Sequence, residues 1–274
     1  MIARIRYHSK GYVAQLERNE AYRRLAESQE QLAEEVAQAA KYVCSLLPEP
    51  IREGPVRVDW RFVPSTQLGG DSFGYHWLDD EHFAVYLLDV SGHGVGASLL
   101  SVSALNMLRS QSLPGADFHN PAEVLERLNA TFVMEQHDNR YFTIWYGVFS
   151  RKTRQLAYAG GGHPPALLLA DGSLAAAAPR LLESQSPPIG WDMGLPFETS
   201  AVAVASGARL FIFSDGVYEI EKTDGENWCF DDFRQFIATM PAGIDAMDHL
   251  LAHVRQLHGS NTLGDDFSIP EAAF

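Results

Sequence analysis

The spacing of hydrophobic residues changes near residue 50, from a helical period to an alternating one. Residues 12–47 contain neither glycine nor proline and are rich in Ala, Glu, Gln, Leu and Arg, which predicts one long helix that the following prolines end. From residue 56 onward, hydrophobic and polar residues alternate, as in a strand with one buried face. The pattern therefore predicts a helical segment over residues 1–50 and a folded domain over residues 51–274.

The predicted helix carries hydrophobic residues in a heptad over three repeats. The two sets of positions are Tyr22, Gln29, Val36 and Val43, and Leu25, Leu32, Ala39 and Leu46. Such a repeat is typical of a coiled coil, although Gln29 and Ala39 weaken the seam. We predict a parallel homodimer through residues 12–47, in preference to an amphipathic helix that packs on its own domain.

The folded domain is predicted to contain about eight strands in two groups. They are residues 56–62, 73–78, 82–89, 142–149, 154–159, 166–170, 200–204 and 209–214. Helical patterns at 95–109 and 121–136 separate the groups, and two more, at 230–239 and 245–258, follow them. Because most strands follow one another directly, antiparallel pairing is favoured. We expect an α+β fold, an α-β-β-α sandwich of two antiparallel sheets flanked by helices and preceded by the long coiled-coil helix.

Composition narrows the possible functions. The net charge of −14 argues against a nucleic-acid partner, because binding phosphate backbones requires clusters of Lys and Arg. The two cysteines, Cys44 and Cys229, lie far apart, which argues against disulfide dependence and against a zinc site and favours a reducing, cytoplasmic location. No hydrophobic run approaches the roughly 20 residues of a membrane span, so we expect no membrane partner.

Acidic residues stand beside glycines at the ends of hydrophobic segments. Asp71, Asp89 and Asp215 do so, and Asp265 and Asp266 follow a glycine near the C-terminus. This arrangement predicts carboxylates gathered at one end of a sheet, where either their pKa values rise or a cation neutralises them. Oxygen ligands alone suit Mg²⁺ or Mn²⁺, and two such ions support hydrolysis of a phosphate ester.

Five short motifs occur in a familiar order. They are Gly69-Gly70-Asp71, Asp89-Val90-Ser91-Gly92-His93-Gly94-Val95-Gly96-Ala97, Ala159-Gly160-Gly161-Gly162-His163-Pro164-Pro165, Ser214-Asp215-Gly216-Val217 and Asp265-Asp266-Phe267-Ser268. Together they resemble the bacterial branch of the PP2C family, the metal-dependent serine/threonine phosphatases of the sporulation and stress-response type. The resemblance covers about residues 56–269 and implies an α-β-β-α sandwich.

The resemblance also implies a role for each acid. Asp89 would bridge two ions, Mn²⁺ or Mg²⁺, with the Val90 carbonyl as a further ligand to one of them. Asp215 and Asp265 would complete the other ion site, and Asp71 would hold metal-bound water. Of the paired acids at the C-terminus, the first aligns better with the family's ligand than the second, Asp266.

Family resemblance extends to substrates and regulation. The implied substrates are phosphoserine or phosphothreonine proteins, in particular STAS-type antagonists of anti-sigma factors. The helices at 95–109 and 121–136 match those credited in the family with switching the metal site on. The first 12 residues and the helix after them are similar to the end of a response-regulator receiver and its output linker, which implies an upstream receiver domain.

Two rival functions stay open at this point. Gly70-Asp71-Ser72 begins a serine-hydrolase signature with Ser72 as nucleophile, but the Asp-x-x-His that this class has near its C-terminus is absent. A phosphatase-like fold could also serve only as a partner-binding switch, although the chain retains all the acids.

Smaller features also lead to expectations. His93 could act as a general acid or organise its loop, and His163 is predicted to be a rigid loop residue near the cleft. Tyr218 stands where the family commonly has Thr. Pro270 cannot donate to a ladder, which predicts that the last strand lies at an edge or ends there.

Overall fold

The computed structural model describes residues 2–65, 68–169, 179–191, 193–239 and 245–274, with side chains from residue 15 onward. The chain divides into two units, Met1–Tyr42 and Val43–Phe274. This boundary lies a few residues before the change of hydrophobic pattern near residue 50.

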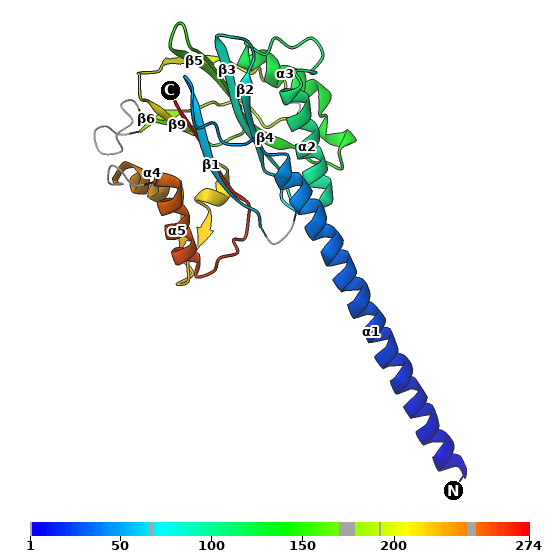
Figure 1. Cartoon of the computed structure of the whole chain (residues 1–274). Helices are drawn as coiled ribbons and strands as arrows, with labels where there is room; N and C mark the ends of the chain where they lie inside the picture. The colour runs from blue at the N-terminus through cyan, green and yellow to red at the C-terminus, as the bar shows by residue number, and fades with distance from the viewer. Residues whose placement is uncertain (1, 66–67, 170–178, 192, 240–244) are drawn as a thin grey trace. The chain divides into compact units, whose positions relative to one another are not determined.

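The first unit consists of most of helix α1, Ile2–Ser45, which begins ten residues before the predicted start (Figure 1). Seam residues of the heptad are open to solvent in the single chain: Leu25 is 54% exposed and Leu32 is 61% exposed. Arg24 pairs with Glu20 at 2.6 Å along the helix surface. The described helices include none that is both long and apolar enough to cross a membrane.

The second unit contains two five-stranded sheets, and the first has the strand order β2-β3-β4-β5-β8. These strands are Ser72–Trp77, His82–Val90, Phe142–Ser150, Gln155–Gly161 and Ser200–Ala203, and every neighbouring pair is antiparallel. The register places Asp89 of β3 opposite Thr143 of β4. Helices α2 (Val95–Arg109) and α3 (Pro121–Thr131) pack on this sheet.

The second sheet has the order β1-β12-β9-β6-β7 and is also antiparallel throughout. Its strands are Arg57–Val63, Phe267–Ala273, Arg209–Phe211, Ala166–Leu169 and Arg180–Leu182. Helices α4 (Phe230–Thr239) and α5 (Ala246–His258) share a hydrophobic cluster with this sheet. A 3-10 turn, η2 (Asp215–Val217), and a short hairpin of β10 (Ile220–Glu221) and β11 (Asn227–Trp228) lie between β9 and α4.

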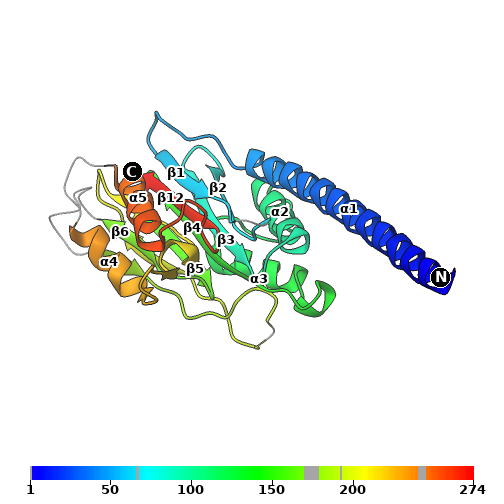
Figure 2. The same ribbon diagram turned by 90° about the horizontal axis from the view of Figure 1, so that it is seen from below.

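Three hydrophobic clusters separate the four layers. Strand β3 shows how the alternating pattern builds them: Tyr86 and Leu88 contribute to the cluster with α2 and α3, whereas Val85 and Leu87 contribute to the cluster between the sheets. Helices α2 and α3 therefore cover one side of the double sheet and α4 and α5 the other (Figures 1 and 2). This arrangement confirms the predicted α-β-β-α sandwich.

Two expectations about element ends were wrong. Helix α3 stops at Thr131 rather than Gln136, because Phe132 leaves the helix and packs edge-on against Phe142. A separate 3-10 turn, η1 (Met134–Gln136), follows.

The expectation that Pro270 marks an edge or an end was also wrong, because β12 lies between β1 and β9 with Pro270 in its middle. The Pro270 carbonyl accepts from the Ile212 amide at 3.1 Å. In an extended strand the backbone N and O atoms of one residue point toward the same neighbouring strand. The nitrogen of Pro270, which carries no hydrogen, therefore faces Ile212, which lies just beyond the end of β9. The sheet therefore loses little by carrying a proline there.

Candidate metal centre

The first predicted acid, Asp89, lies one residue before the end of β3, and the chain then leaves the sheet in a glycine-rich loop. Ser91 holds the loop to Tyr141, the residue before β4: the Ser91 amide donates to the Tyr141 carbonyl at 2.9 Å, and Ser91 Oγ accepts from the Tyr141 amide at 3.1 Å. Gly92 and Gly94 have φ angles of 83° and 91°, which side chains rarely permit. These glycines allow the sharp turn that leads from Asp89 into α2.

The other acids come from the opposite sheet. Asp215 begins η2, directly after β9 and its short extension, and Asp265 lies two residues before β12. Gly216 is required here, because a Cβ at this position would lie 2.2 Å from the Asp266 carbonyl oxygen. The Asp-Gly pair thus lets the two segments come together side by side.

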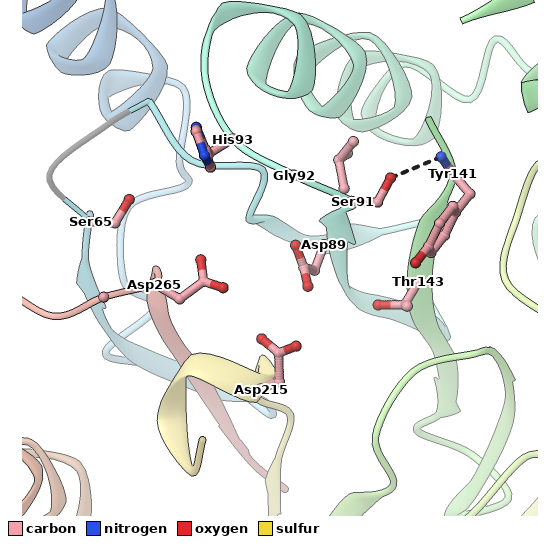
Figure 3. Close-up of a pocket in the computed structure, with 11 residues that line it drawn as sticks. Ser65, Asp89, Ser91, Gly92, His93, Tyr141, Thr143, Asp215 and Asp265 are labelled. Carbon is pink, nitrogen blue, oxygen red and sulfur yellow. Dashed lines mark hydrogen bonds between the residues drawn. The ribbon is translucent and has the colours of Figure 1, made fainter. Parts of the chain in front are cut away.

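The carboxylates of Asp89, Asp215 and Asp265 face a common space from three segments of the chain (Figure 3). They line a cavity of about 340 Å³. The other described residues around it are Ser65, Val90, Ser91, Gly92, His93, Tyr141, Thr143 and Gly264. Four of the five predicted metal-site residues therefore meet in one cavity, although as many as 176 positions separate Asp89 from Asp265 in the sequence.

Without a bound ion, it is energetically unfavourable for these neighbouring carboxylates to be ionised. Burial, and then the neighbouring charges of Asp215 and Asp265, raise the pKa of Asp89 to about 8. Burial, together with Asp265 and Glu219, raises the pKa of Asp215 to about 6. Converging carboxylates that resist ionisation are what a divalent cation with oxygen ligands would relieve, so the residues present fit Mg²⁺ or Mn²⁺.

The predicted Asp71 does not line the cavity and is only 4% exposed. Its carboxylate accepts from the Ser268 hydroxyl of β12. Burial, then the charges of Asp89 and Asp266, raise the pKa of Asp71. Asp71 is therefore a neighbour of Asp89 that approaches from the protein interior.

Asp266 forms the support beneath the site. It is 2% exposed, and its carboxylate accepts from the amides of Ser65 at 2.8 Å and Asp71 at 3.4 Å. A Cβ on Gly69 would lie 1.4 Å from Asp266 Oδ2, and one on Gly70 would lie 2.4 Å from the Val90 carbonyl oxygen. The Gly-Gly-Asp motif thus exists because backbone must pass between Asp266 and the Asp89 loop.

The two histidines of the motifs take different positions. His93 lines the cavity at its rim (Figure 3). His163 is buried, and its Nδ1–H donates to the Pro164 carbonyl at 2.9 Å, which leaves Nε2 without a partner. Burial lowers the pKa of His163 to about 4, so this ring is neutral at physiological pH.

The rival serine nucleophile is placed unfavourably. Ser72 lies in β2, is 1% exposed and shares a hydrogen bond of 2.7 Å with Ser101 Oγ of α2. A nucleophile needs access to substrate and a nearby base. The position of Ser72 therefore offers no support for the Gly-Asp-Ser hydrolase.

Sequence reasoning missed several residues of the cavity wall, including Ser65, Tyr141 and Thr143. Thr143 reaches the cavity only because the register pairs it with Asp89. Such a pairing has no local signature in the sequence.

Comparisons with known proteins agree with this geometry. The family model described as stage II sporulation protein E (SpoIIE) matches residues 79–272, which is most of the chain. The chain belongs to the SpoIIE family. It thus carries a SpoIIE-family phosphatase domain of the PP2C type, as the five motifs predicted.

Individual relatives cover different parts of this SpoIIE-family chain. Phosphoserine phosphatase RsbP of Bacillus subtilis is 30% identical over 186 residues, which are 68% of this chain and 45% of RsbP. The chain spans less than half the length of the curated relatives that it matches.

Two solved structures share the fold. The SiaA-PP2C domain of Pseudomonas aeruginosa matches with a TM-score of 0.74 and 18% identity, over 90% of this chain and 98% of that one. The RsbU and RsbW domains of Rv1364c from Mycobacterium tuberculosis match with a TM-score of 0.63 and 23% identity, over 82% and 62% of the respective chains.

Proposed function

We propose that this SpoIIE-family domain is a metal-dependent protein phosphatase that hydrolyses phosphoserine or phosphothreonine on a regulatory protein. The observation that carries the proposal is the convergence of Asp89, Asp215 and Asp265 on one cavity. These acids come from both sheets, and their burial makes the ion-free state unfavourable. A site that only bound a partner protein would not require buried carboxylates that resist ionisation.

At the proposed site, Asp89 would serve both divalent ions, the Val90 carbonyl would contribute to one of them, and Asp215 and Asp265 would complete the other. When bound, the ions would lower the pKa of a water molecule and offset the charge of the phosphoryl group for in-line attack. Asp265 is preferred to Asp266 as a ligand because Asp265 lines the cavity, whereas the Asp266 carboxylate is occupied by two backbone amides.

Asp71 would position a water molecule at this site, in keeping with the resemblance to the family. Its own orientation is set by the hydrogen bond from Ser268. Because Asp71 lies behind Asp89, its charge also favours a cation at Asp89 over an ion-free site. We therefore assign Asp71 to positioning and charge, and Asp89 to direct ligation.

The charge of the cavity wall bears on how a phosphate would be held. Its described residues include no Lys or Arg, and His93 is the one histidine among them. A phosphate dianion next to several carboxylates is repelled unless cations lie between them. The proposed recognition of a phosphoprotein therefore depends on the ions.

Regulation is proposed to act through α2. Its Ser98 hydroxyl donates to the Gly69 carbonyl at 2.6 Å, and its first turn follows the Asp89 loop directly. A shift of α2 would thus move both the Gly-Gly-Asp segment and Asp89. We propose that an upstream receiver acts through a homodimer of residues 12–47 to set the position of this helix.

The substrate is proposed to be a phosphorylated STAS-type antagonist of an anti-sigma factor. The family resemblance implies this class, and a regulatory role is in keeping with the RsbU and RsbW domains that one solved relative combines.

The test is release of phosphate from an aryl phosphate and from a phosphorylated STAS protein, with and without Mn²⁺. We expect Mn²⁺-dependent release that Asp89→Asn reduces by about a thousandfold, since ion-based stabilisation of a transition state contributes several kcal/mol. Asp80→Asn, an exposed acid outside the cavity, is the matched control and should keep full activity. Hydrolysis that is independent of added metal and survives Asp89→Asn would refute the proposal.

A further inference from the structure

A second group of metal-ligating side chains lies away from the cavity. Asp79 is in the turn between β2 and β3, His82 begins β3, and His119 lies in the loop between α2 and α3. One ligand atom from each lies within 4.8 Å of the others. His82 and Asp89 are seven residues apart on β3, or about 24 Å at ~3.4 Å per residue, so this group is separate from the acids of the cavity.

The atoms of this group are arranged around one carboxylate oxygen. Asp79 Oδ2 lies 2.9 Å from His82 Nδ1 and 2.9 Å from His119 Nε2. The two imidazole rings are perpendicular, with centroids 4.8 Å apart. Two imidazole nitrogens therefore face the same carboxylate oxygen, and the three atoms lie within 4.8 Å of one another.

Backbone contacts hold the acids in place before any ion binds. Asp79 Oδ1 accepts from the amides of Glu81 at 2.7 Å and His82 at 2.8 Å. On the far side of the second ring, Asp117 Oδ1 lies 3.0 Å from His119 Nδ1 and accepts from the His119 amide at 3.0 Å. A carboxylate on the outer nitrogen of a histidine is the usual support of a zinc-ligating imidazole, because it fixes the tautomer and increases the basicity of the inner nitrogen.

We propose that Asp79, His82 and His119 form a second metal site that binds one Zn²⁺ and fastens the loop before α3 to the turn before β3. Imidazole nitrogens favour zinc over the hard ions expected at the cavity. Three protein ligands would leave the fourth tetrahedral position to water. Ligand bonds of about 2.1 Å require donor atoms about 3.3 Å apart. The two N···O pairs would open by about 0.4 Å, and the two nitrogens, which lie within 4.8 Å of each other, would close by up to about 1.5 Å.

The alternative to a bound ion is a hydrogen-bonded network of the same side chains. Both ring nitrogens of His119 face carboxylate oxygens, so in that state the ring would be an imidazolium held between Asp79 and Asp117. Metal uptake distinguishes the two states.

The decisive experiment is a calorimetric titration of Zn²⁺ into the whole chain in saturating Mg²⁺, which would compete for the acids of the cavity. We expect one Zn²⁺ per chain, and expect the double variant His82→Gln/His119→Gln to lose it. Asp117→Asn, which changes only the support, should weaken binding by about 10- to 100-fold. Asp89→Asn, which disables the cavity, should bind Zn²⁺ as the wild type does.

The matched control uses another pair of neighbouring histidines among the described residues. His249 and His253 are one turn apart on α5 and both stack on Phe236. His249→Gln should leave the Zn²⁺ uptake unchanged, and uptake that His249→Gln abolishes would overturn the assignment.

A measurement on the wild type alone keeps the proposal testable if a variant fails to fold. Zinc X-ray absorption of the Mg²⁺-saturated chain should show nitrogen and oxygen neighbours at about 2.0–2.1 Å with the scattering of two imidazoles. No saturable Zn²⁺ uptake, or a spectrum without imidazole scattering, refutes the second site.

Discussion

Asp215→Asn is predicted to stabilise the metal-free domain at neutral and alkaline pH while it weakens ion binding. The pKa of Asp215 is raised from its ordinary value of 3.8 to about 6 by burial, Asp265 and Glu219. Below about pH 4 the residue is protonated in both the folded and the unfolded chain and contributes nothing. Between pH 4 and 6 the folded chain retains a proton that the unfolded chain has lost, so stability falls as the pH rises.

Above about pH 6 the full cost of the ionised carboxylate is present. A pKa that rises from 3.8 to about 6 corresponds to about 3 kcal/mol of folding free energy, which is an upper value because water still reaches Asp215. Asparagine keeps an oxygen that can accept the Gly216 amide but carries no charge. The variant should therefore gain up to about 3 kcal/mol at pH 8, and the gain should vanish toward pH 4.

The assay is urea unfolding in a chelator, followed at pH 4 and at pH 8. With a slope of about 2 kcal/mol per molar urea, the midpoint of the variant at pH 8 should exceed that of the wild type by up to about 1.5 M. Added Mn²⁺ should reverse the order, because the wild type binds ions more tightly than the variant and so gains more stability from them. Asp80→Asn serves as the exposed control and should change neither midpoint.

An equal or lower midpoint for Asp215→Asn at pH 8 in the chelator would refute the reasoning. It would mean that the three carboxylates do not repel one another in the folded chain. A gain that stays the same at pH 4 would also contradict it, because the charge is absent there.

Further predictions concern packing, assembly and ion removal. Gly70→Ala should destabilise the domain by about 1–3 kcal/mol in thermal unfolding, because its Cβ would lie 2.4 Å from the Val90 carbonyl oxygen. Gly264→Ala is the control and should not change stability, because a Cβ at Gly264 would meet nothing within 4 Å. Leu25→Glu/Leu32→Glu should convert the proposed dimer to a monomer in sedimentation analysis, and an unchanged mass would exclude the seam. Removal of divalent ions should lower the midpoint of thermal unfolding, and readdition of ions should restore both the midpoint and phosphatase activity. A midpoint that a chelator does not change would contradict ion binding at the site.

The fold could be predicted from the sequence wherever a pattern is local. Helix α2 has the predicted bounds, because its glycine-rich start and the polar turn at its end are both visible in the chain. Pro270 shows the limit of this reasoning. A proline is tolerated inside a sheet when its nitrogen faces the end of a neighbouring strand, and the position of that end depends on the register.

The residues of the site also fall into those that local sequence features predict and those that only the fold brings together. Asp89, Asp215 and Asp265 could be chosen because glycines and strand ends mark them locally. Asp71 carries the same marks, yet burial places it behind the cavity wall. Thr143 and the supporting role of Asp266 depend on contacts between segments far apart in the sequence, which only the folded chain brings together.

The central claim is that the converging acids bind two hard divalent ions. The most direct test is equilibrium binding of Mn²⁺ to the whole chain, with free ion measured by electron paramagnetic resonance. The account predicts two saturable ions per chain, both weakened by Asp89→Asn, with the count unchanged by Asp80→Asn. No saturable binding of Mn²⁺, or two bound ions whose affinity Asp89→Asn leaves unchanged, would contradict it.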